Sequence, residues 1–443
     1  MAPPLSWVHG TNDPDTDFSL ANIPFGIIST KAKPRPHAAV AIGSYACDLE
    51  VFSAHPDFYD YYFPALRDHH GVFSQPTLNA FAALGRQVHH EVRDTLKNMF
   101  TDGHPFSHFL QVVGKTLMIL VPLDSVKMHL PMQIGDYTDF YAGVVHATHV
   151  GTMFRGPENA LQPNYKHIPV CYHGRSSSIV VSGTPVRRPW GQFVADPTKV
   201  PKQPETRPSQ KLDFEVELGC FISRPNDMGM PIHIEDAEDH IFGYVLLNDW
   251  SARDIQAWEY VPLGPFNGKN FATTISPWVV LHEALKPFMT AGEPSDTELQ
   301  PYLQETSRNN VFDIKLSADL QITRDNEAFK LTRTNAKHLL WSFPQMIAHH
   351  TVGGCPLRTG DLLGSGTISS VSELGDGGGS LLELSENGKK ELGWTTASGG
   401  VQNRTFLLDG DTVTIRGFAF DDQIGRVGFG ECIGRVEGAL GRG

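Results

Sequence analysis

The chain has 443 residues and a net charge of −13 at neutral pH, with 40% hydrophobic and 19% charged residues. The hydrophobic share is enough to build a buried core, which excludes global disorder. The acidic balance argues against nucleic acid and anionic membrane as partners, because contacts to phosphate groups need clustered lysines and arginines.

Glycine and proline are more frequent than in an average chain, with 42 and 31 residues. This excess predicts many turns and short strands rather than long helical bundles. The five cysteines lie far apart in the sequence and form no CxxC pair. We therefore expect free thiols in a reducing, cytoplasmic compartment. The N-terminus lacks the pattern of a signal peptide, and no apolar run is long enough to span a bilayer, so we expect a soluble protein.

The N-terminal part predicts a small β domain with one helix. Apolar runs at 24–30 and 38–49 are typical of strands of a small barrel or sheet. Between residues 75 and 98, apolar residues recur at intervals of three and four, which predicts an amphipathic helix. A connecting strand is predicted at 115–123. We place a boundary near residue 131, which gives domains 1–131 and 132–443.

The second domain is predicted to be mostly β, with a few short helices on its rim. Its clearest strand signals are at 177–183, 211–223 and 241–249. The proline-rich segment 192–210 predicts a surface loop.

Two local signals suggest a helix and a hairpin in this domain. Ser251 and Asp254 match a capping box at the start of a helix that Pro262 ends. Asp409 and Gly410 stand between two alternating runs, which predicts a β-hairpin.

Several familiar motifs fail at a required position. The segment around Lys269 lacks the spacing of a P-loop, and residues 428–434 miss the dinucleotide fingerprint by one residue. The acidic residues at 13, 15 and 17 lack the glycine and glutamate of an EF-hand. There is also no GxSxG elbow. These absences argue against phosphoryl transfer, Rossmann redox chemistry and serine hydrolysis as leading hypotheses.

Three acidic side chains alternate along the strand predicted at 211–223. Asp213, Glu215 and Glu217 would point to one side, because side chains of a strand alternate between its faces. A solvated outer face is the simpler interpretation of this segment alone. A cluster of carboxylates that needs a cation is the alternative, and both stay open here.

Further acids lie in two other segments. Asp249 closes an apolar run, where a lone charge is costly to bury unless it is paired or metal-bound. Asp136 and Asp139 lie among aromatic residues, and His146 follows seven residues after Asp139. Carboxylates from three parts of the chain, without cysteines or a close histidine pair, favour Mg²⁺ or Ca²⁺ over zinc. Four carboxylates around a divalent ion remain negative, so a nearby lysine or arginine is expected.

The segment after Asp249 offers such groups. Arg253, Gln256 and Tyr260 share one face of the predicted helix, and Lys269 follows. From spacing alone, an exposed amphipathic surface helix is an equal alternative.

Long strings of this sequence closely resemble the fumarylacetoacetase family. They include GDYTDFY, HATHVGTMFRG, PVCYHGRSSSIVVSGTP, LDFEVELG, FLLDGDTV and the whole segment from Leu247 to Val280. The likeness covers nearly the whole chain in unbroken order. It implies a mainly β fold with some α, made of a small N-terminal SH3-like barrel and a large C-terminal β-roll domain.

The resemblance also implies roles for individual residues. The implied metal ligands and their neighbours are Asp139, Glu215, Glu217, Asp249, Lys269 and Thr273. The implied catalytic groups are the general base His146, its orienting acid Glu383, and the charge-stabilising Arg253, Gln256 and Lys269. The implied substrate-binding residues are Tyr141, Arg155, Tyr172, Gln256, Tyr260 and Thr367. Asp136 and Asp213 do not match ligands and are expected to be structural. Ala272 departs from the family pattern, which has glycine there.

The family reaction is the metal-dependent hydrolysis of a carbon–carbon bond in 4-fumarylacetoacetate, which gives fumarate and acetoacetate at the end of tyrosine and phenylalanine breakdown. The resemblance therefore implies a small diketo-dicarboxylate substrate, Mg²⁺ or Ca²⁺ as cofactor, and a homodimer. Two alternatives stay open. One is a related hydrolase or decarboxylase of another β-diketone or acylpyruvate, and the other is a non-enzymatic metal-binding protein that kept the fold.

Overall fold

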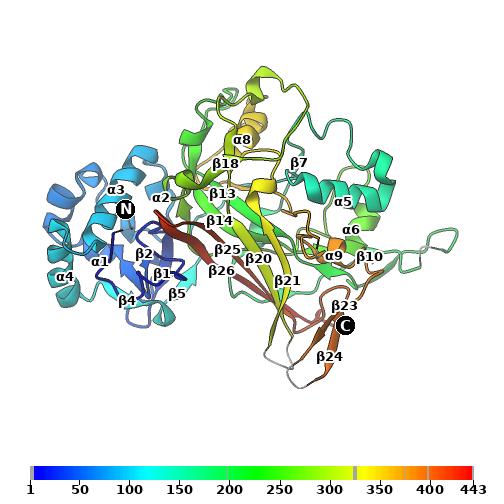
Figure 1. Cartoon of the computed structure of the whole chain (residues 1–443), viewed down its shortest axis with the longest axis horizontal. Helices are drawn as coiled ribbons and strands as arrows, with labels where there is room; N and C mark the ends of the chain where they lie inside the picture. The colour runs from blue at the N-terminus through cyan, green and yellow to red at the C-terminus, as the bar shows by residue number, and fades with distance from the viewer. Residues whose placement is uncertain (1–3, 197, 323–326, 374, 397–398, 442–443) are drawn as a thin grey trace.

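The computed structural model describes residues 4–196, 198–322, 327–373, 375–396 and 399–441. The N-terminal segment, blue to cyan in Figure 1, gathers at one side of the molecule, and long strands of the remaining chain run through the middle. The predicted mainly β architecture with some α is confirmed. Within the described ranges, no helix is long and apolar enough to cross a membrane.

The N-terminal region is built on a five-stranded antiparallel sheet with the order β4-β3-β2-β1-β5. Its strands are β1 (Phe25–Ser29), β2 (His37–Ile42), β3 (Tyr45–Asp48), β4 (Leu120–Pro122) and β5 (Lys127–His129). The apolar run at 38–49 thus makes two paired strands rather than one. Gly43 turns the chain between them with φ +54°, a conformation that favours glycine.

Four helices accompany this sheet: α1 (Leu49–Ser53), α2 (Asn79–Ala82), α3 (Arg86–Phe100) and α4 (Pro105–Leu117). The single helix predicted at 75–98 is wrong, because Gly85 adopts φ +86° and separates α2 from α3. Of the strand predicted at 115–123, only residues 120–122 form a strand, which is β4. The first residues of the predicted strand belong to α4, which ends at Leu117. Its apolar run lacks the alternation that would distinguish a strand from a buried helix.

A large mixed sheet forms the centre of the molecule, with the order β7-β6-β22-β13-β14-β16-β8 and β17 paired to β14. Its strands are β6 (Tyr137–Phe140), β7 (Cys171–His173), β8 (Ile179–Val181), β13 (Val216–Ile222), β14 (Ile241–Asp249), β16 (Thr273–Ile275), β17 (Val280–Leu281) and β22 (Leu362–Gly364). On β14, Val245 and Leu247 pack in the core shared with the N-terminal region, whereas Tyr244 and Leu246 pack in the main core. Burial on both faces explains the unbroken apolar run that predicted this strand.

A second sheet has the order β21-β20-β25-β26-β9. Its strands are β9 (Val186–Arg187), β20 (Lys315–Gln321), β21 (Ala328–Asn335), β25 (Thr412–Asp421) and β26 (Gly425–Glu437). The hairpin predicted at Asp409 and Gly410 is wrong. Gly410 does turn with φ +93°, but β25 pairs with β20 and β26, and the amide of Leu407 donates to the carbonyl of Leu212.

Four two-stranded ladders complete the β structure: β10 (Trp190–Phe193) with β11 (Glu205–Pro208), β12 (Leu212–Asp213) with β15 (Ser251–Ala252), β18 (Met289–Ala291) with β19 (Asn309–Phe312), and β23 (Leu392–Thr395) with β24 (Val401–Arg404). The loop predicted at 192–210 is therefore partly a β-hairpin, and its residue 197 lies outside the described residues. The strand predicted at 211–223 is interrupted between β12 and β13.

The remaining helices are α5 (Val144–Arg155), α6 (Arg253–Glu259), α7 (His282–Leu285), α8 (Phe343–Thr351) and α9 (Leu381–Leu384). Short 3-10 or π segments lie at 58–62, 64–66, 72–74, 123–125, 157–159, 176–178, 237–240, 286–288, 301–303 and 336–338. The capping box predicted at Ser251 is wrong, because α6 has Ala252 at its N-cap. Asp254 instead accepts hydrogen bonds from the hydroxyl of Ser209 and the amide of Gln210.

All five cysteines are free thiols, as expected. They are the buried Cys47, Cys220 and Cys432 and the exposed Cys171 and Cys355.

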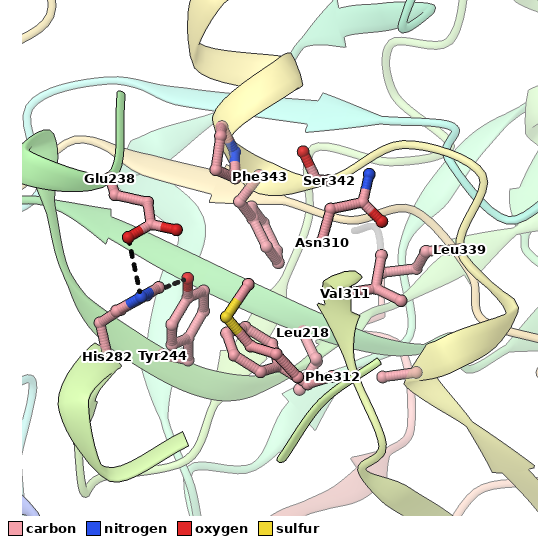
Figure 2. Close-up of a pocket in the computed structure, with 13 residues that line it drawn as sticks. Leu218, Glu238, Tyr244, His282, Asn310, Val311, Phe312, Leu339, Ser342 and Phe343 are labelled. Atoms are coloured by element: carbon pink, nitrogen blue, oxygen red, sulfur yellow. Dashed lines mark hydrogen bonds and ion pairs between the residues drawn. The ribbon is translucent and has the colours of Figure 1, made fainter. Parts of the chain in front are cut away.

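A small cavity lies beside β14 (Figure 2). Tyr244, Phe312 and Phe343 are among its lining residues, and His282 bridges Tyr244 and Glu238 at its polar edge. Its volume is about 10 Å³, which is the space of a single water molecule. This cavity therefore cannot hold a substrate with two carboxylates.

We predict that Gly434→Ala destabilises the fold. A Cβ at Gly434 would lie 2.2 Å from Cζ2 of Trp250, which is fully buried and has its indole nitrogen bonded to Thr274. We expect the free energy of unfolding to fall by about 1–3 kcal/mol, the usual cost of overpacking a core. Gly353→Ala is the matched control, because a Cβ there meets no atom within 4 Å. Chemical denaturation of both variants checks this, and equal stabilities would contradict it.

Candidate active site

Four buried carboxylates converge at the ends of the central strands. They belong to Asp139 on β6, Glu215 just before β13, Glu217 near the start of β13, and Asp249 at the end of β14. One oxygen of each lies within 4.8 Å of the others. The sheet order β6-β22-β13-β14 brings these strand ends together. Burial at 0–4% relative exposure excludes the solvated outer face as the explanation of Glu215 and Glu217.

Two cations lie against this carboxylate cluster. The ammonium of Lys269 is 2.5 Å from Oε2 of Glu215 and 2.6 Å from Oδ2 of Asp249. The guanidinium of Arg253 is 2.8 Å from Oε1 of Glu215. Burial alone would raise the pKa of Glu215, but Lys269 and Arg253 outweigh it and lower that pKa to about 2. Glu215 is therefore the carboxylate that the protein itself neutralises.

The other three carboxylates are not neutralised to the same extent. Burial and the neighbouring acids raise the pKa values of Asp139 and Glu217 well above the usual range, and the pKa of Asp249 is raised in the same direction. Oδ1 of Asp139, Oε1 of Glu217 and the hydroxyl of Tyr137 are buried without a hydrogen-bond partner. Unsatisfied carboxylate oxygens and excess negative charge are what a hard divalent cation relieves. The residues present therefore fit such an ion.

Thr273 and Tyr172 fix the orientation of Asp249. The hydroxyl of Thr273 donates to Oδ1 at 3.2 Å, and the hydroxyl of Tyr172 donates to Oδ2 at 3.0 Å. Thr273 is aligned with Asp249 in the β14–β16 pair, so the sheet register itself places the two side chains together.

A histidine and a glutamate form a buried pair near the cluster. Nδ1 of His146 on α5 donates to Oε2 of Glu383 on α9 at 2.7 Å. The same oxygen accepts from the hydroxyls of Ser369 and Ser380 at 2.9 and 3.0 Å, and Oε1 accepts from Nδ1 of His149 at 3.0 Å. In the neutral ring, donation from Nδ1 leaves the lone pair that a general base needs on Nε2.

These contacts set the charge of Glu383. Burial opposes ionisation, but the interactions with His146, His149 and Ser369 outweigh it and hold the pKa of Glu383 far below its usual value. The hydrogen bond from His149 to Glu383 in turn raises the pKa of His149. Glu383 is thus a carboxylate shared by two histidines, the buried His146 and the half-exposed His149.

The expected substrate-binding residues lie at different distances from these groups. The ring of Tyr141 meets the ring of His146 edge-on, with centroids 5.5 Å apart. Thr367 is buried, and its backbone closely approaches Gly143 at the start of α5. Arg253 donates to the side chain of Gln256 at 3.3 Å.

Two of the expected residues lie at the surface. Arg155 is exposed and donates to the backbone carbonyls of Asn159 and Ala160. Tyr260 ends α6 with 51% of its surface exposed. The structure therefore does not bring Tyr260 into the carboxylate cluster. Ala272 packs within the main hydrophobic core.

Sequence reasoning missed several partners of these groups. It did not connect His149 with Glu383, although a position three residues after His146 on a helix signals a shared face. Ser380 lies three residues before Glu383 and caps α9, so its Ser-x-x-Glu spacing was a local signal that could have found it. Ser369 and Tyr137 had no such local signal.

Sequence-family comparisons cover nearly the whole chain. A family described as "Fumarylacetoacetase N-terminal" matches residues 21–131, and one described as "Fumarylacetoacetate (FAA) hydrolase C-terminal" matches residues 137–437. The chain belongs to the fumarylacetoacetase family.

Curated relatives are similar along their full length. A fumarylacetoacetase of Aspergillus fumigatus is 56% identical over 96% of this chain and 97% of its own, and that of Homo sapiens is 46% identical over the same shares. Among solved structures, a fumarylacetoacetate hydrolase from Exiguobacterium antarcticum is 16% identical, with a TM-score of 0.47 over 94% of this chain and 99% of that one.

Proposed function

We propose that this protein hydrolyses the carbon–carbon bond between the fumaryl carbonyl carbon and the central methylene of 4-fumarylacetoacetate and releases fumarate and acetoacetate. The observation that carries the proposal is the buried carboxylate cluster beside the His146–Glu383 pair, in a chain 56% identical to a fumarylacetoacetase. The match of residues 21–131 to the N-terminal family supports this reaction over that of other diketone or acylpyruvate enzymes.

Asp139, Glu215, Glu217 and Asp249 would hold the metal ion, with Lys269 and Thr273 fixing the carboxylates. The all-oxygen donor set favours Mg²⁺ or Ca²⁺. When bound, such an ion supplies Lewis-acid polarisation of the diketone oxygens.

His146 acts as the general base. Its Nε2 takes a proton from water, while Glu383 holds the ring through Nδ1 and stabilises the imidazolium. The hydroxide attacks the carbonyl carbon on the fumaryl side, the bond to the neighbouring methylene carbon breaks, and that carbon takes up a proton as acetoacetate leaves. The substrate dianion and one water thus give two carboxylate products and one released proton.

The remaining expected residues stabilise or hold the substrate. Arg253 and Lys269 provide the positive charge that opposes negative charge developing on the diketone oxygens, and Gln256 lies against Arg253. The substrate-binding set is Tyr141, Arg155, Tyr172, Gln256, Tyr260 and Thr367. Arg155 would need to exchange its backbone contacts for a substrate carboxylate.

One assay tests the proposed function. Purified protein with Mg²⁺ or Ca²⁺ should remove the diketone absorbance of fumarylacetoacetate, with fumarate and acetoacetate appearing in equal amounts. An acylpyruvate assayed in parallel should turn over at least about 10²-fold more slowly. Turnover of the acylpyruvate alone would assign the chain to the related enzymes. Metal binding without turnover of either compound would favour a non-enzymatic binding protein.

We predict that Glu215→Gln weakens metal binding strongly. The change removes one ligand charge and leaves Lys269 with a single carboxylate partner. An affinity loss of about 10²-fold is expected, against a small change for the control Asp213→Asn, since Asp213 is not in the carboxylate cluster. Titration calorimetry with Mg²⁺ and Ca²⁺ measures both, and equal losses would mean that another acid of this strand is the ligand.

Two further expectations accompany this proposal. The homodimer implied by family resemblance stays a prediction, which sedimentation equilibrium tests. The five free thiols support a reducing compartment such as the cytosol.

A further inference from the structure

Asp213 is the acid of the predicted strand that does not join the carboxylate cluster. It is fully buried, and both its oxygens are used. Oδ1 accepts from the amides of Phe214 and Leu381 at 2.8 and 2.7 Å, and Oδ2 accepts from the amide of Leu382 at 2.9 Å and from Nε of Arg253 at 2.8 Å. A single carboxylate therefore binds groups from three separate segments.

Two of these segments carry groups of the active site. Arg253 begins α6, and its guanidinium also reaches Glu215 in the carboxylate cluster. Leu381 and Leu382 begin α9, and the next residue is Glu383, which binds His146. Asp213 is thus a shared hydrogen-bond partner of Arg253 and of α9, the helix that carries Glu383.

We propose that Asp213 is a positioning residue, which holds Arg253 and Glu383 in register with each other. The inference rests on the proposed function and adds a residue to that site. Neither side chain is fixed by its own segment alone. α9 is only four residues long, so without the acceptor its first two amides lose the hydrogen bonds that set its direction. Arg253 would keep Glu215 and Gln256 but lose the Asp213 oxygen that accepts from its Nε.

The chain supplies a matched control for this role. Asp411 is buried at 1%, accepts from Nε and Nη2 of Arg404 at 2.8 and 3.0 Å, and accepts from the amide of Leu408 at 2.8 Å. It is the same kind of buried aspartate–arginine pair with a backbone donor. Arg404 lies on β24, whereas the carboxylates of the cluster lie on β6, β13 and β14 and on the residue just before β13. A merely structural aspartate should therefore behave alike at both positions.

The experiment compares Asp213→Asn with Asp411→Asn. Both should lower the melting temperature, because each leaves a buried arginine short of a charge partner. Only Asp213→Asn should lower kcat, by about 10²-fold with KM little changed, since small misplacements of reacting groups have effects of that size. Combined with Glu383→Gln, its loss should be smaller than the product of the two single losses, because the residues act as a unit.

A readout without turnover separates this inference from the proposed function. The low-field proton resonance of the His146–Glu383 hydrogen bond should shift in Asp213→Asn and stay in place in Asp411→Asn. If the wild-type protein does not hydrolyse fumarylacetoacetate, the function is wrong, and this resonance still tests Asp213. Equal kcat values and unshifted resonances in both variants would overturn the inference.

Asp213→Glu covers the case in which Asp213→Asn does not fold. It keeps the charge that pairs with Arg253 and displaces the carboxylate by one methylene. We expect kcat to remain at least about tenfold below wild type, because position and not charge is disturbed. Recovery of wild-type kcat and an unshifted resonance would show that charge pairing suffices, and would overturn the positioning role.

Discussion

His146→Ala should lower kcat by at least about 10²-fold, which is the lower end of what a general base contributes. The melting temperature and metal content should stay close to wild type. Glu383 would keep hydrogen bonds from His149, Ser369 and Ser380, so its buried carboxylate would not lack partners in the variant. Steady-state kinetics, thermal unfolding and metal analysis of one preparation measure all three quantities.

Glu383→Gln tests whether the base acts as part of a pair. The kcat of Glu383→Gln should fall by much of the factor expected for His146→Ala, because a neutral amide does not stabilise an imidazolium on His146. The double variant should lose little more than the worse single variant. Losses that multiply would contradict a working pair. Near-normal turnover of His146→Ala would show that another group activates water, and His149, already bonded to Glu383, would be the next to test.

Removal of the divalent ion should abolish turnover and lower the melting temperature. Within the part of the chain that the structure describes, Lys269 and Arg253 are the lysine and arginine in direct contact with the four carboxylates, and the raised pKa values of Asp139 and Glu217 mark the uncompensated charge. A bound ion at 100 times its dissociation constant adds about 2.7 kcal/mol to the folded state. Thermal unfolding with chelator and after re-addition of Mg²⁺ or Ca²⁺ measures the change.

Glu217→Gln supplies the control for this experiment. It removes one of the repelling charges, so in chelator the variant should unfold at a higher temperature than the wild type, and re-addition of metal should stabilise it less. Full activity after exhaustive chelation, with metal content verified, would contradict the metal requirement. A chelator effect equal in both proteins would mean that the repulsion is not the cause.

Residue types and their spacing predicted much of the site chemistry, and the family resemblance assigned the individual roles. Oxygen donors without cysteine ligands suggested a hard cation, and a charged helix after Asp249 suggested its counter-charges. Period-two alternation placed Glu215 and Glu217 on one side of their strand, and in the structure both reach the carboxylate cluster. The strand at 241–249 was predictable because it is buried on both faces, which leaves a continuous apolar run.

Local signals failed where tertiary contacts outweighed them. Asp409 and Gly410 predict a β-hairpin between the two flanking runs. In the structure, the run after the turn is β25, which pairs with β20 and β26 instead. The apolar run at 115–123 had no period to separate helix from strand.

By itself, the sequence determined the kinds of donor this protein can offer and, through periodicity, which of them share a face. Only the tertiary structure decided which distant residues meet. In the folded chain, Asp213 accepts hydrogen bonds from Arg253 and from the first amide of α9, and His149 is hydrogen-bonded to Glu383. Tyr260 remains exposed. The physical reason is that periodicity is a property of one segment, whereas a hydrogen bond between β12 and α9 depends on how every intervening strand is ordered in the sheet.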